Sequence, residues 1–235
     1  MKLSIIIPCC NEELNIPRLV PELWPVLENI GGDFEVIMVD DGSKDSTAAE
    51  IKKIIKPQAH LVQHEVNRGL GSAMRTGIAA ATGDRLIFLD CDLTFSPNLI
   101  PRLIAGAASH PEADFIIGSP NLGGYGEGIP AWRLWISKAA NFIYYILLGQ
   151  PITSINQILR LYKTADLKSL PLEAMGFDIN AEILFKLVFR GKKFFEVPAE
   201  LTNRLLGVSK LNYRREIQRH LVLTLKIIKW KLFGF

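Results

Sequence analysis

The stretch Arg85–Leu93 reads RLIFLDCDL, an apolar run followed by two aspartates. The run is short and does not alternate with polar residues, which is typical of a strand buried on both faces of a mostly parallel sheet. Residues i and i+2 of an extended chain face the same way, so Asp90 and Asp92 present two carboxylates to one side. Such a pair can bind a hard divalent cation, together with diphosphate oxygens and water. The stretch therefore predicts a buried strand with a candidate cation site after it.

Comparable apolar runs lie on both sides of this stretch in the sequence. They predict further strands at Ser4–Ile7, Glu35–Val39, His60–Gln63, Phe115–Gly118 and Phe194–Val197. Helical patterns separate them over the first 120 residues, which indicates βαβ units. The expected fold class is α/β, with a mostly parallel central sheet flanked by helices.

The first predicted helix contains three prolines. Pro17 suits an initial turn, but Pro21 and Pro25 are expected to kink or break the helix, so that it starts late or bends. Three later helices are expected at Trp132–Leu148, Gly176–Arg190 and His220–Phe235. We expect one large domain over residues 1–212, followed by a basic amphipathic helix at 213–235.

Polar residues also follow the first two predicted strands, at Pro8–Glu13 and Asp40–Ser43. Ligands of open parallel sheets bind in the crevice beyond the carboxyl ends of the strands, so these segments and Asp90–Asp92 are expected to converge there. Asp41 can accept a hydrogen bond from a base N–H or a ribose hydroxyl. The alternative for Asp40 and Asp41 is a turn cap on Gly42-Ser43.

The composition excludes several classes of protein. The chain has 235 residues, of which 49% are hydrophobic and 22% charged, which fits one large folded domain and excludes disorder. A net charge of +3 is too small to indicate a nucleic-acid partner. Three cysteines, two of them adjacent, do not form a disulfide framework, so a reduced, cytoplasmic setting is expected.

Short motifs of a recognisable kind recur along nearly the whole chain. Over the first 120 residues they are Ser4–Pro8, Asn11–Glu13, Val39–Ser43, Asn67–Gly71, Thr76-Gly77, Ala81–Asp84 and Asp90–Leu93. Later in the chain they are Arg133 with Ser137, Gly176-Phe177 with Glu182, Glu196–Pro198, and Arg204 with Gly207, Ser209 and Lys210. Together these motifs resemble glycosyltransferase family 2 with the GT-A fold, and the later ones resemble its dolichol-phosphate mannose synthase-like, polyprenyl-phosphate branch. The resemblance implies that residues 1–212 are a catalytic domain, with a donor half of about 1–120 and an acceptor half of about 121–212.

The resemblance implies a role for each matching residue. The nucleoside pocket would be lined by Pro8, Glu12, Val39 and Asp41. Cys10 would also contact the donor, although an aromatic residue is usual at its position. The metal and diphosphate would be held by Asp90, Cys91, Asp92 and Thr94, with metal ligands at Asp90, Asp92 and Thr94. Arg204 and Lys210 would approach the donor phosphates, and Arg133 and Ser137, one helical turn apart, would bind the acceptor phosphate. The catalytic set would be Asp90, Asp92, Arg133 and Arg204.

The implied reaction is an inverting transfer of a hexose from a GDP- or UDP-linked sugar to a polyprenyl or dolichyl phosphate, assisted by Mg²⁺ or Mn²⁺. A second hypothesis is a family 2 enzyme with a saccharide or glycolipid hydroxyl as acceptor. That reaction needs a general base, for which Asp178, Glu182 and Glu200 are candidates. A third is a nucleotide-sugar-binding relative with impaired catalysis, because Pro120 and Ser154 replace residues usual in this branch.

The C-terminal segment His220–Phe235 carries Leu221, Leu225, Ile228 and Leu232 at helical spacing, with lysines between them. This pattern suits a helix lying in a membrane interface, and upstream arginines would attract anionic lipid. The alternative is that its apolar side packs on the domain. Peripheral contact on the cytoplasmic face of a membrane is therefore among the expectations.

Overall fold

The computed structural model describes residues 1–127, 131–207 and 213–235, and it describes only the backbone of residues 131–134, 136, 137, 140 and 213. Within these ranges the strands are β1 (Leu3–Cys9), β2 (Phe34–Asp40), β3 (Ala59–Gln63), β4 (Arg85–Phe88), β5 (Phe115–Ser119), β6 (Arg160–Lys163) and β7 (Phe194–Pro198). The helices are α1 (Ile16–Ile30), α2 (Thr47–Ile54), α3 (Leu70–Ala80), α4 (Ile100–Ser109), α5 (Pro120–Gly123), α6 (Ala131–Leu148), α7 (Thr164–Lys168), α8 (Ile179–Phe189) and α9 (Tyr213–Phe233), with a 3₁₀ turn η1 (Pro97–Leu99).

These strands form a single seven-stranded sheet in the order β3-β2-β1-β4-β6-β5-β7. β6 runs antiparallel to β4 and β5, and the other pairs are parallel. All six strands expected from the sequence are present, which confirms the α/β class. β6 was not expected, since its four residues Arg160–Lys163 mix two basic residues with two apolar ones.

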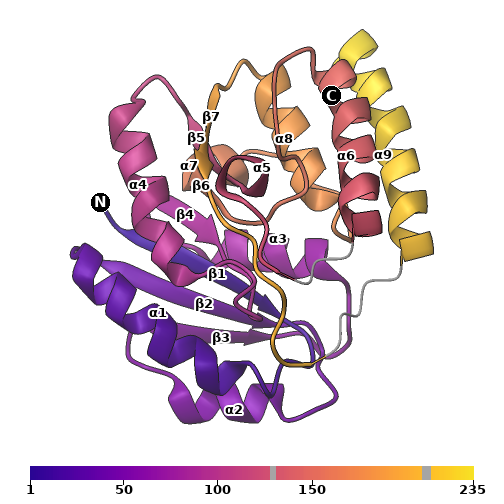
Figure 1. Ribbon diagram of the computed structural model, residues 1–235. Helices are drawn as coiled ribbons and strands as arrows, with labels where there is room; N and C mark the ends of the chain where they lie inside the picture. The colour runs from indigo at the N-terminus through magenta and orange to yellow at the C-terminus, as the bar shows by residue number, and fades with distance from the viewer. Residues whose placement is uncertain (128–130, 208–212) are drawn as a thin grey trace.

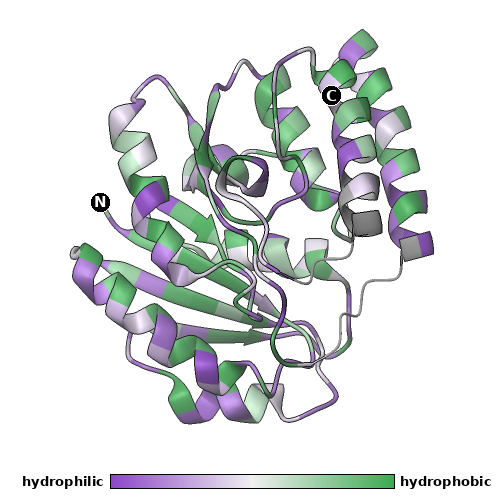
Figure 2. Cartoon of the chain, in the orientation of Figure 1, coloured by the Kyte–Doolittle hydropathy of each residue, from purple (hydrophilic) through white to green (hydrophobic). Residues whose placement is uncertain are grey.

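Helices cover both faces of the sheet. α1 contacts α2 and α4, whereas α3 packs on β1 and β2 and contacts α7. Figure 1 shows α1 and α4 in front of the sheet and α3 behind it. The strands between these layers are the most apolar part of the chain, as Figure 2 shows, and Ile5, Ile6 and Ile7 have no exposed surface. The carboxyl ends of β1, β2 and β4 therefore project from a rigid core.

The first helix corrects a prediction. α1 begins at Ile16 and runs without a break to Ile30, with Pro21 and Pro25 inside it. The three prolines are four residues apart, so they share one face, and all three are exposed. The carbonyls that lose an N–H partner thus face water, while Leu19, Leu23 and Leu27 pack into the core on the other side. The free energy gained by burying these leucines outweighs the loss of the backbone hydrogen bonds at the prolines.

Two helix starts differ from the apolar patterns in the sequence. α8 begins at Ile179, three residues after the expected start at Gly176, because the Asp178 side chain accepts a hydrogen bond from Gly176 N at 2.9 Å, which holds the preceding residues in a loop. α9 begins at Tyr213, seven residues before its apolar pattern at His220 and at the residue expected for the start of the basic helix at 213–235. The apolar pattern locates both helices, but it does not fix where they begin.

Glu35 joins the starts of three strands in a buried cluster. Its Oε1 accepts hydrogen bonds from Ser4 Oγ and Thr82 N, both at 2.6 Å, and from Gly83 N at 3.2 Å. Lys2 Nζ lies 3.5 Å from Oε2, and the Glu35 side chain is only 5% exposed. Since Ser4 is in β1, Glu35 in β2 and Gly83 precedes β4, this carboxylate fixes the relative position of the three strands that carry the candidate site.

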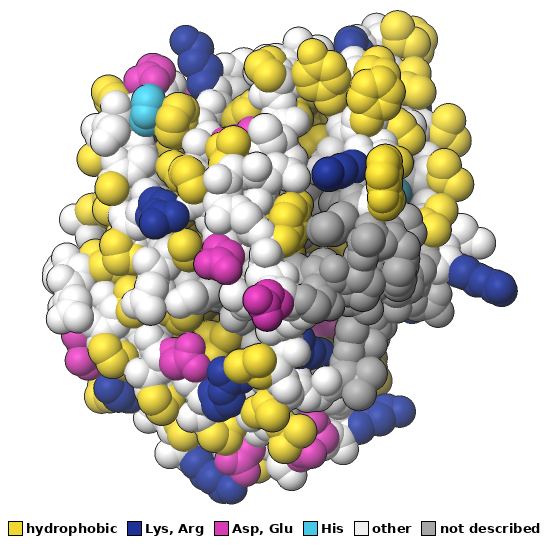
Figure 3. Space-filling view, viewed as in Figure 1, with side chains coloured by type: hydrophobic (Ala, Val, Ile, Leu, Met, Phe, Trp, Pro, Cys, Tyr) yellow, Lys and Arg dark blue, Asp and Glu magenta, His cyan; other side chains and the backbone are white. Residues whose placement is uncertain are grey.

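α6 and α9 pack against each other at one side of the molecule, and α9 also contacts α8. Leu223 and Ile227 of α9 are buried against the domain. The opposite side of both helices is apolar and exposed, and Figure 3 shows hydrophobic side chains gathered over them. We call this the α6–α9 face; its members are Trp135, Phe142, Ile143, Tyr145, Ile146, Leu221, Val222, Leu225, Ile228, Leu232 and Phe233. No described helix, α6 and α9 included, is both long enough and apolar enough to cross a membrane.

Candidate active site

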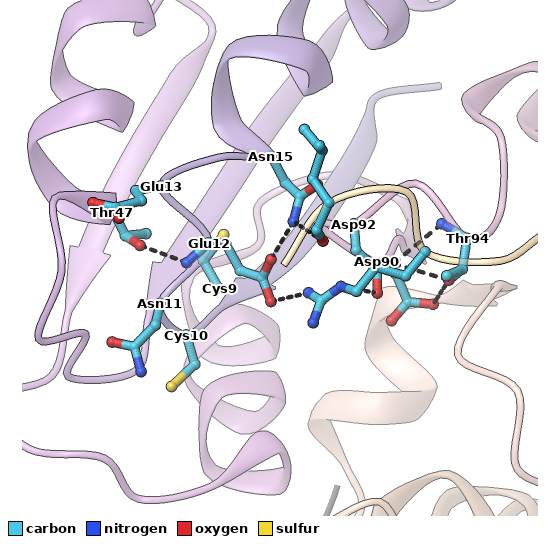
Figure 4. Close-up of polar contacts among 12 residues, drawn as sticks. Cys9, Cys10, Asn11, Glu12, Glu13, Asn15, Thr47, Asp90, Asp92 and Thr94 are labelled. Carbon is cyan, nitrogen blue, oxygen red and sulfur yellow. Dashed lines mark hydrogen bonds and ion pairs between the residues drawn. The ribbon is translucent and has the colours of Figure 1, made fainter. Parts of the chain in front are cut away.

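Three oxygen-bearing side chains come together directly after β4. Thr94 Oγ1 donates to Asp92 Oδ1 at 2.9 Å and lies 3.3 Å from Asp90 Oδ2. Thr94 N also donates to Asp92 Oδ1, at 3.1 Å. Leu93 between them adopts φ 60, the left-handed region that a leucine seldom occupies, and this turn brings Thr94 back onto both carboxylates. Figure 4 shows Asp90, Asp92 and Thr94 grouped in this way.

The electrostatics of this group fit a divalent cation. Loss of hydration and the neighbouring Asp92 carboxylate raise the pKa of Asp90 to about 8, against the hydrogen bond from Thr94 and the charge of Arg204. Carboxylate and hydroxyl oxygens are hard ligands of the kind that Mg²⁺ and Mn²⁺ take. Within the described residues no group of three or more His, Cys, Asp or Glu side chains is placed so that it could hold a metal ion by itself. An open set of this kind leaves ligand positions for diphosphate and water.

Arg204 reaches this group from a distant part of the chain. Its Nε lies 3.1 Å from Asp92 Oδ2, and its Nη2 forms an ion pair with Glu12 Oε1. The segment after β7 is held in place by Thr202, whose N and Oγ1 both donate to the Thr94 carbonyl, at 2.9 and 3.1 Å. Thr94 thus anchors Arg204 as well as the two aspartates, a link that sequence spacing gave no means of predicting.

The segment after β1 lies beside these residues. Asn11 has φ 50, and its N donates to Ser43 Oγ at 2.8 Å. Glu12 N donates to Thr47 Oγ1 at 2.6 Å, and the Glu12 carboxylate accepts a hydrogen bond from Asn15 Nδ2 at 2.6 Å. Figure 4 shows Glu12 pointing toward Asp92 and Asp90. The predicted convergence of the segments after β1 and β4 is therefore observed.

Asp41, at the end of β2, is almost fully buried, with 3% of its surface exposed. Its Oδ1 contacts His64 Nδ1 at 2.6 Å and accepts a hydrogen bond from Arg68 N at 2.9 Å, and its Oδ2 accepts one from Gly69 N at 2.8 Å. Asp40 instead accepts hydrogen bonds from Ser43 N and Gln63 Nε2, at 3.1 and 3.2 Å. The turn-cap alternative thus describes Asp40, while Asp41 ties β2 to the loop before α3.

Other predicted donor residues occupy different environments. Pro8 pairs with Val39 across β1 and β2. The side chains of Val39 and Cys91 are 0% and 4% exposed and belong to the hydrophobic core, so only their backbone faces the site. Cys10 is partly exposed, and its Sγ accepts a hydrogen bond from Asn67 Nδ2 at 3.0 Å.

Some predicted donor and acceptor residues fall outside what the structure describes, while the two positions that depart from the family pattern are described. Lys210 lies in the undescribed segment 208–212, and the side chains of Arg133 and Ser137 are likewise outside the described atoms, although their backbone belongs to α6. Pro120 begins the short helix α5 and is buried. Ser154 is 1% exposed, and its N donates to Glu196 Oε1 at 3.0 Å.

The general-base candidates of the hydroxyl-acceptor hypothesis are differently placed. Glu182 is 1% exposed, forms an ion pair with Lys186 at 2.7 Å, and accepts a hydrogen bond from Ala174 N at 2.8 Å. A carboxylate so enclosed cannot reach a substrate, so Glu182 is wrong as a base. Burial also raises the pKa of Asp178, which accepts the hydrogen bond from Gly176 N. Glu200 is exposed.

Sequence reasoning missed His64 and assigned no role to Thr76 of the Thr76-Gly77 motif. His64 is 8% exposed and joins Asp41 to Thr76, with His64 Nε2 lying 2.9 Å from Thr76 Oγ1. Its position one residue after β3, at the same edge of the sheet as Asp41, is the signal that could have identified it.

The chain is similar to known glycosyl transferases. The family model "Glycosyl transferase family 2" matches residues 4–170. A dolichol-phosphate mannosyltransferase from Pyrococcus furiosus is 30% identical over 241 residues, an alignment that covers 98% of this chain and 65% of that protein. An undecaprenyl-phosphate mannosyltransferase from Micrococcus luteus is 29% identical over 221 residues, covering 90% of this chain and 88% of the relative. The chain thus spans about two thirds of the first relative and most of the second.

A solved structure shares the fold. Glucosyl-3-phosphoglycerate synthase from Mycobacterium tuberculosis, in complex with Mn²⁺ and UDP-glucose, superposes with a TM-score of 0.72 at 22% identity, covering 95% of this chain and 77% of that chain. This likeness confirms the expected GT-A architecture.

Proposed function

The chain belongs to glycosyl transferase family 2, and we propose that it transfers a hexose from a nucleotide diphosphate sugar to a polyprenyl phosphate. The observation that carries the proposal is the group Asp90, Asp92 and Thr94 with Arg204 beside it, at the carboxyl end of β4. The names of the Pyrococcus and Micrococcus relatives support a lipid phosphate as acceptor.

In this proposal Asp90, Asp92 and Thr94 hold Mg²⁺ or Mn²⁺, which supplies charge neutralisation at the leaving diphosphate. Arg204 adds a fixed positive charge beside the same oxygens, because its guanidinium already lies against Asp92. Glu12 and Asn15 orient Arg204 from the β1 side. Lys210, Arg133 and Ser137 are proposed to contact the donor phosphates and the acceptor phosphate, as the family motif implies.

A phosphate acceptor needs no strong general base, because its oxygen is already anionic near neutral pH. It attacks the anomeric carbon from the face opposite the diphosphate, the new C–O bond forms as the bond to the diphosphate breaks, and the configuration inverts. The chain's contribution is position and charge. The enclosure of Glu182 in its ion pair with Lys186 removes one of the three general-base candidates that a hydroxyl acceptor would require.

The test is release of nucleoside diphosphate from a panel of nucleotide sugars with Mn²⁺ or Mg²⁺, with and without a polyprenyl phosphate. We expect release that requires the lipid phosphate and is lost in Asp92→Ala. Arg133→Ala is expected to weaken the response to the lipid phosphate and leave slow hydrolysis of the donor intact. Release that ignores the lipid phosphate would assign another acceptor, and binding without any release would assign a nucleotide-sugar-binding protein.

We also propose that the α6–α9 face rests on the cytoplasmic surface of a membrane, where a lipid acceptor resides. Leu221, Leu225 and Leu232 are 62%, 68% and 69% exposed. An apolar patch of this kind is seldom left in water and usually marks a surface that contacts a partner or a membrane. Arg214, Arg215, Lys229 and Lys231 lie exposed on the same helix and would attract anionic lipid.

Co-sedimentation with vesicles of phosphatidylglycerol and phosphatidylcholine tests this placement. The double variant Leu225→Glu, Leu232→Glu should lose vesicle binding, whereas Ile55→Glu, which changes an exposed apolar residue just after α2, should retain it. Equal vesicle binding by both variants would show that the α6–α9 face does not bind the membrane.

A further inference from the structure

Glu196, the third residue of β7, binds the loop that follows α6. Its Oε2 accepts a hydrogen bond from Thr153 N at 2.8 Å. Its Oε1 accepts one from Thr153 Oγ1 and one from Ser154 N, both at 3.0 Å. Hydrogen bonds to an ionised carboxylate are roughly twice as strong as neutral ones. Glu196 therefore fixes two consecutive residues of the loop between α6 and β6 with both of its oxygens.

Thr153 connects Glu196 to three other elements. Because its hydroxyl proton is donated to Glu196, Ser119 Oγ, 2.6 Å away at the end of β5, is the donor to Thr153 Oγ1. The Thr153 carbonyl accepts hydrogen bonds from Asn121 Nδ2 of α5 and, at 3.1 Å, from Asn141 Nδ2 of α6. One loop residue thus joins β7, β5, α5 and α6.

Asn141 is the residue through which this network reaches α6. Arg133, Ser137 and Asn141 follow one another at intervals of four residues, so these positions lie on one stripe of the helix. Tyr144 Oη instead contacts His220 Nδ1 at 2.7 Å, which joins α6 to α9. The hydrogen bond from Asn141 therefore links the stripe that contains positions 133 and 137 to the sheet.

The network lies at the same edge of the sheet as the candidate active site. Ser119 is the last residue of β5, and β5 runs antiparallel to β6, as β4 does. β4 and β5 therefore end at the same edge, where Asp90 and Asp92 follow β4. The contacts of Thr153 thus help to set the distance between α6 and these carboxylates.

We propose that Glu196 is a positioning residue for the acceptor site, because it holds α6 at this edge through Thr153 and Asn141. This inference rests on the proposed function, in which Arg133 and Ser137 of α6 bind the acceptor phosphate. Glu196 touches neither substrate in this proposal. Its effect is on the place at which α6 presents the acceptor, so its loss should weaken the use of the acceptor and spare the use of the donor.

Glu196→Gln tests the network with little change in side-chain size. An amide has a single acceptor oxygen, and its NH₂ group would face a donor that the carboxylate now accepts. The substitution also removes a negative charge, which by itself would favour the binding of an anionic acceptor. A rise in the KM for a polyprenyl phosphate would therefore report the position of α6 and not the change in charge.

Asp114→Asn is the matched control. Asp114 Oδ1 accepts a hydrogen bond from Lys163 Nζ at 2.8 Å, and Oδ2 accepts one from Lys193 N at 3.0 Å. Asp114 precedes β5, Lys163 ends β6 and Lys193 precedes β7. This carboxylate therefore joins the same part of the sheet at the opposite edge, away from α5 and the Thr153 loop.

The experiment measures release of nucleoside diphosphate with Mn²⁺, the nucleotide sugar that the wild type uses, and varied undecaprenyl phosphate. The variants are Glu196→Gln, Asn141→Leu, their double variant and Asp114→Asn, each checked by thermal unfolding. We expect each of the first two to raise the KM for the lipid phosphate about 10-fold, with kcat within about 3-fold and the KM for the donor within about 2-fold. Because both break one link, the double variant should match the weaker single variant, and Asp114→Asn should keep the wild-type KM.

The outcomes separate this inference from the proposed function. An unchanged KM for the lipid phosphate in a folded Glu196→Gln, or an equal loss of donor and acceptor use, overturns the positioning role and leaves the transferase proposal intact. Additive effects in the double variant overturn the link through Thr153. If Glu196→Gln does not fold, Asn141→Leu decides, because the same link predicts the same rise in KM. A wild type that turns over the donor without any response to the lipid phosphate overturns the proposed acceptor, and this inference with it.

Discussion

Replacing Glu35 by glutamine should remove a pH-dependent part of the stability of the sheet. Burial alone would raise the pKa of Glu35, but hydrogen bonds from Ser4 and Thr82 and the charge of Lys2 lower it from 4.5 to about 2. The difference of about 2.5 pH units corresponds to up to about 3 kcal/mol of folding free energy. The side chain is 5% exposed, so solvent screens little of this.

The sign follows from proton linkage. Because the folded pKa is depressed, the unfolded chain binds the proton more tightly, and acid favours unfolding. The contribution is fully present above about pH 4.5 and is lost as the pH falls through 4.5 toward 2. Between pH 6 and pH 3.5 the wild type should lose about 1.4 kcal/mol through this group alone. Glutamine does not titrate, so Glu35→Gln lacks this loss.

Urea unfolding at pH 6 and pH 3.5 measures the effect. The difference in unfolding free energy between the wild type and Glu35→Gln should be smaller at pH 3.5 by about 1.4 kcal/mol. Glu28→Gln is the matched control, because Glu28 is 60% exposed in its 3.4 Å ion pair with Lys56, and its difference from the wild type should stay within about 0.5 kcal/mol at both pH values. A Glu35→Gln difference that does not change with pH would refute the reasoning.

Three further outcomes follow from the site and its support. Gly71→Ala should destabilise the chain by about 1–3 kcal/mol in urea unfolding and weaken nucleotide binding, because its Cβ would lie 2.1 Å from the Ala174 carbonyl oxygen; a wild-type midpoint would contradict this. Lys186→Met should lower the free energy of unfolding by about 3–5 kcal/mol, because it leaves Glu182 buried without its counter-charge. The double variant Lys186→Met, Glu182→Gln should recover part of that loss. A double variant less stable than Lys186→Met alone would argue against the ion pair as the cause. Arg204→Lys should lower kcat/KM about 10-fold or more with little change in stability, because an ammonium cannot span Glu12 and Asp92 together as the guanidinium does; unchanged kinetics would place Arg204 outside the reaction.

Much of the fold could be predicted because its signals are local. The runs at β1, β2 and β4 are continuous and apolar, and parallel pairing places their carboxyl ends at one edge of the sheet. The approach of Glu12 to Asp92 follows from that topology alone. β6 could not be predicted in this way, because Arg160 is an unusual residue for a strand: it is fully buried and donates through Nη1 to the carbonyl of Asn180 at 2.9 Å, a partner 20 residues away.

The parts of the site that escaped prediction depend on contacts between distant segments. Thr202 meets the Thr94 carbonyl across 108 residues, and that contact helps to bring Arg204 to Asp92. The role of His64 depends on the folded position of Thr76, on α3. The prolines of α1 show the opposite case. The local preference of proline predicted a kink or break, but the packing of the helix against the core keeps it continuous.

The charge balance at the edge of the sheet links these observations to the proposed reaction. Glu12, Asp90 and Asp92 bring three carboxyl groups together, and among the described residues Arg204 provides the guanidinium that bridges two of them. The charge of Arg204 is not enough to keep Asp90 ionised at neutral pH. Burial and the neighbouring Asp92 disfavour the ionised form and raise the pKa of Asp90 to about 8. Added positive charge at this point would stabilise the ionised pair, and a diphosphate carries negative charge to the same place. In the proposed reaction a divalent cation and a nucleoside diphosphate would therefore depend on each other for binding here. The cation would relieve the repulsion between the aspartates, and the diphosphate would supply ligands that two carboxylates and a hydroxyl leave open.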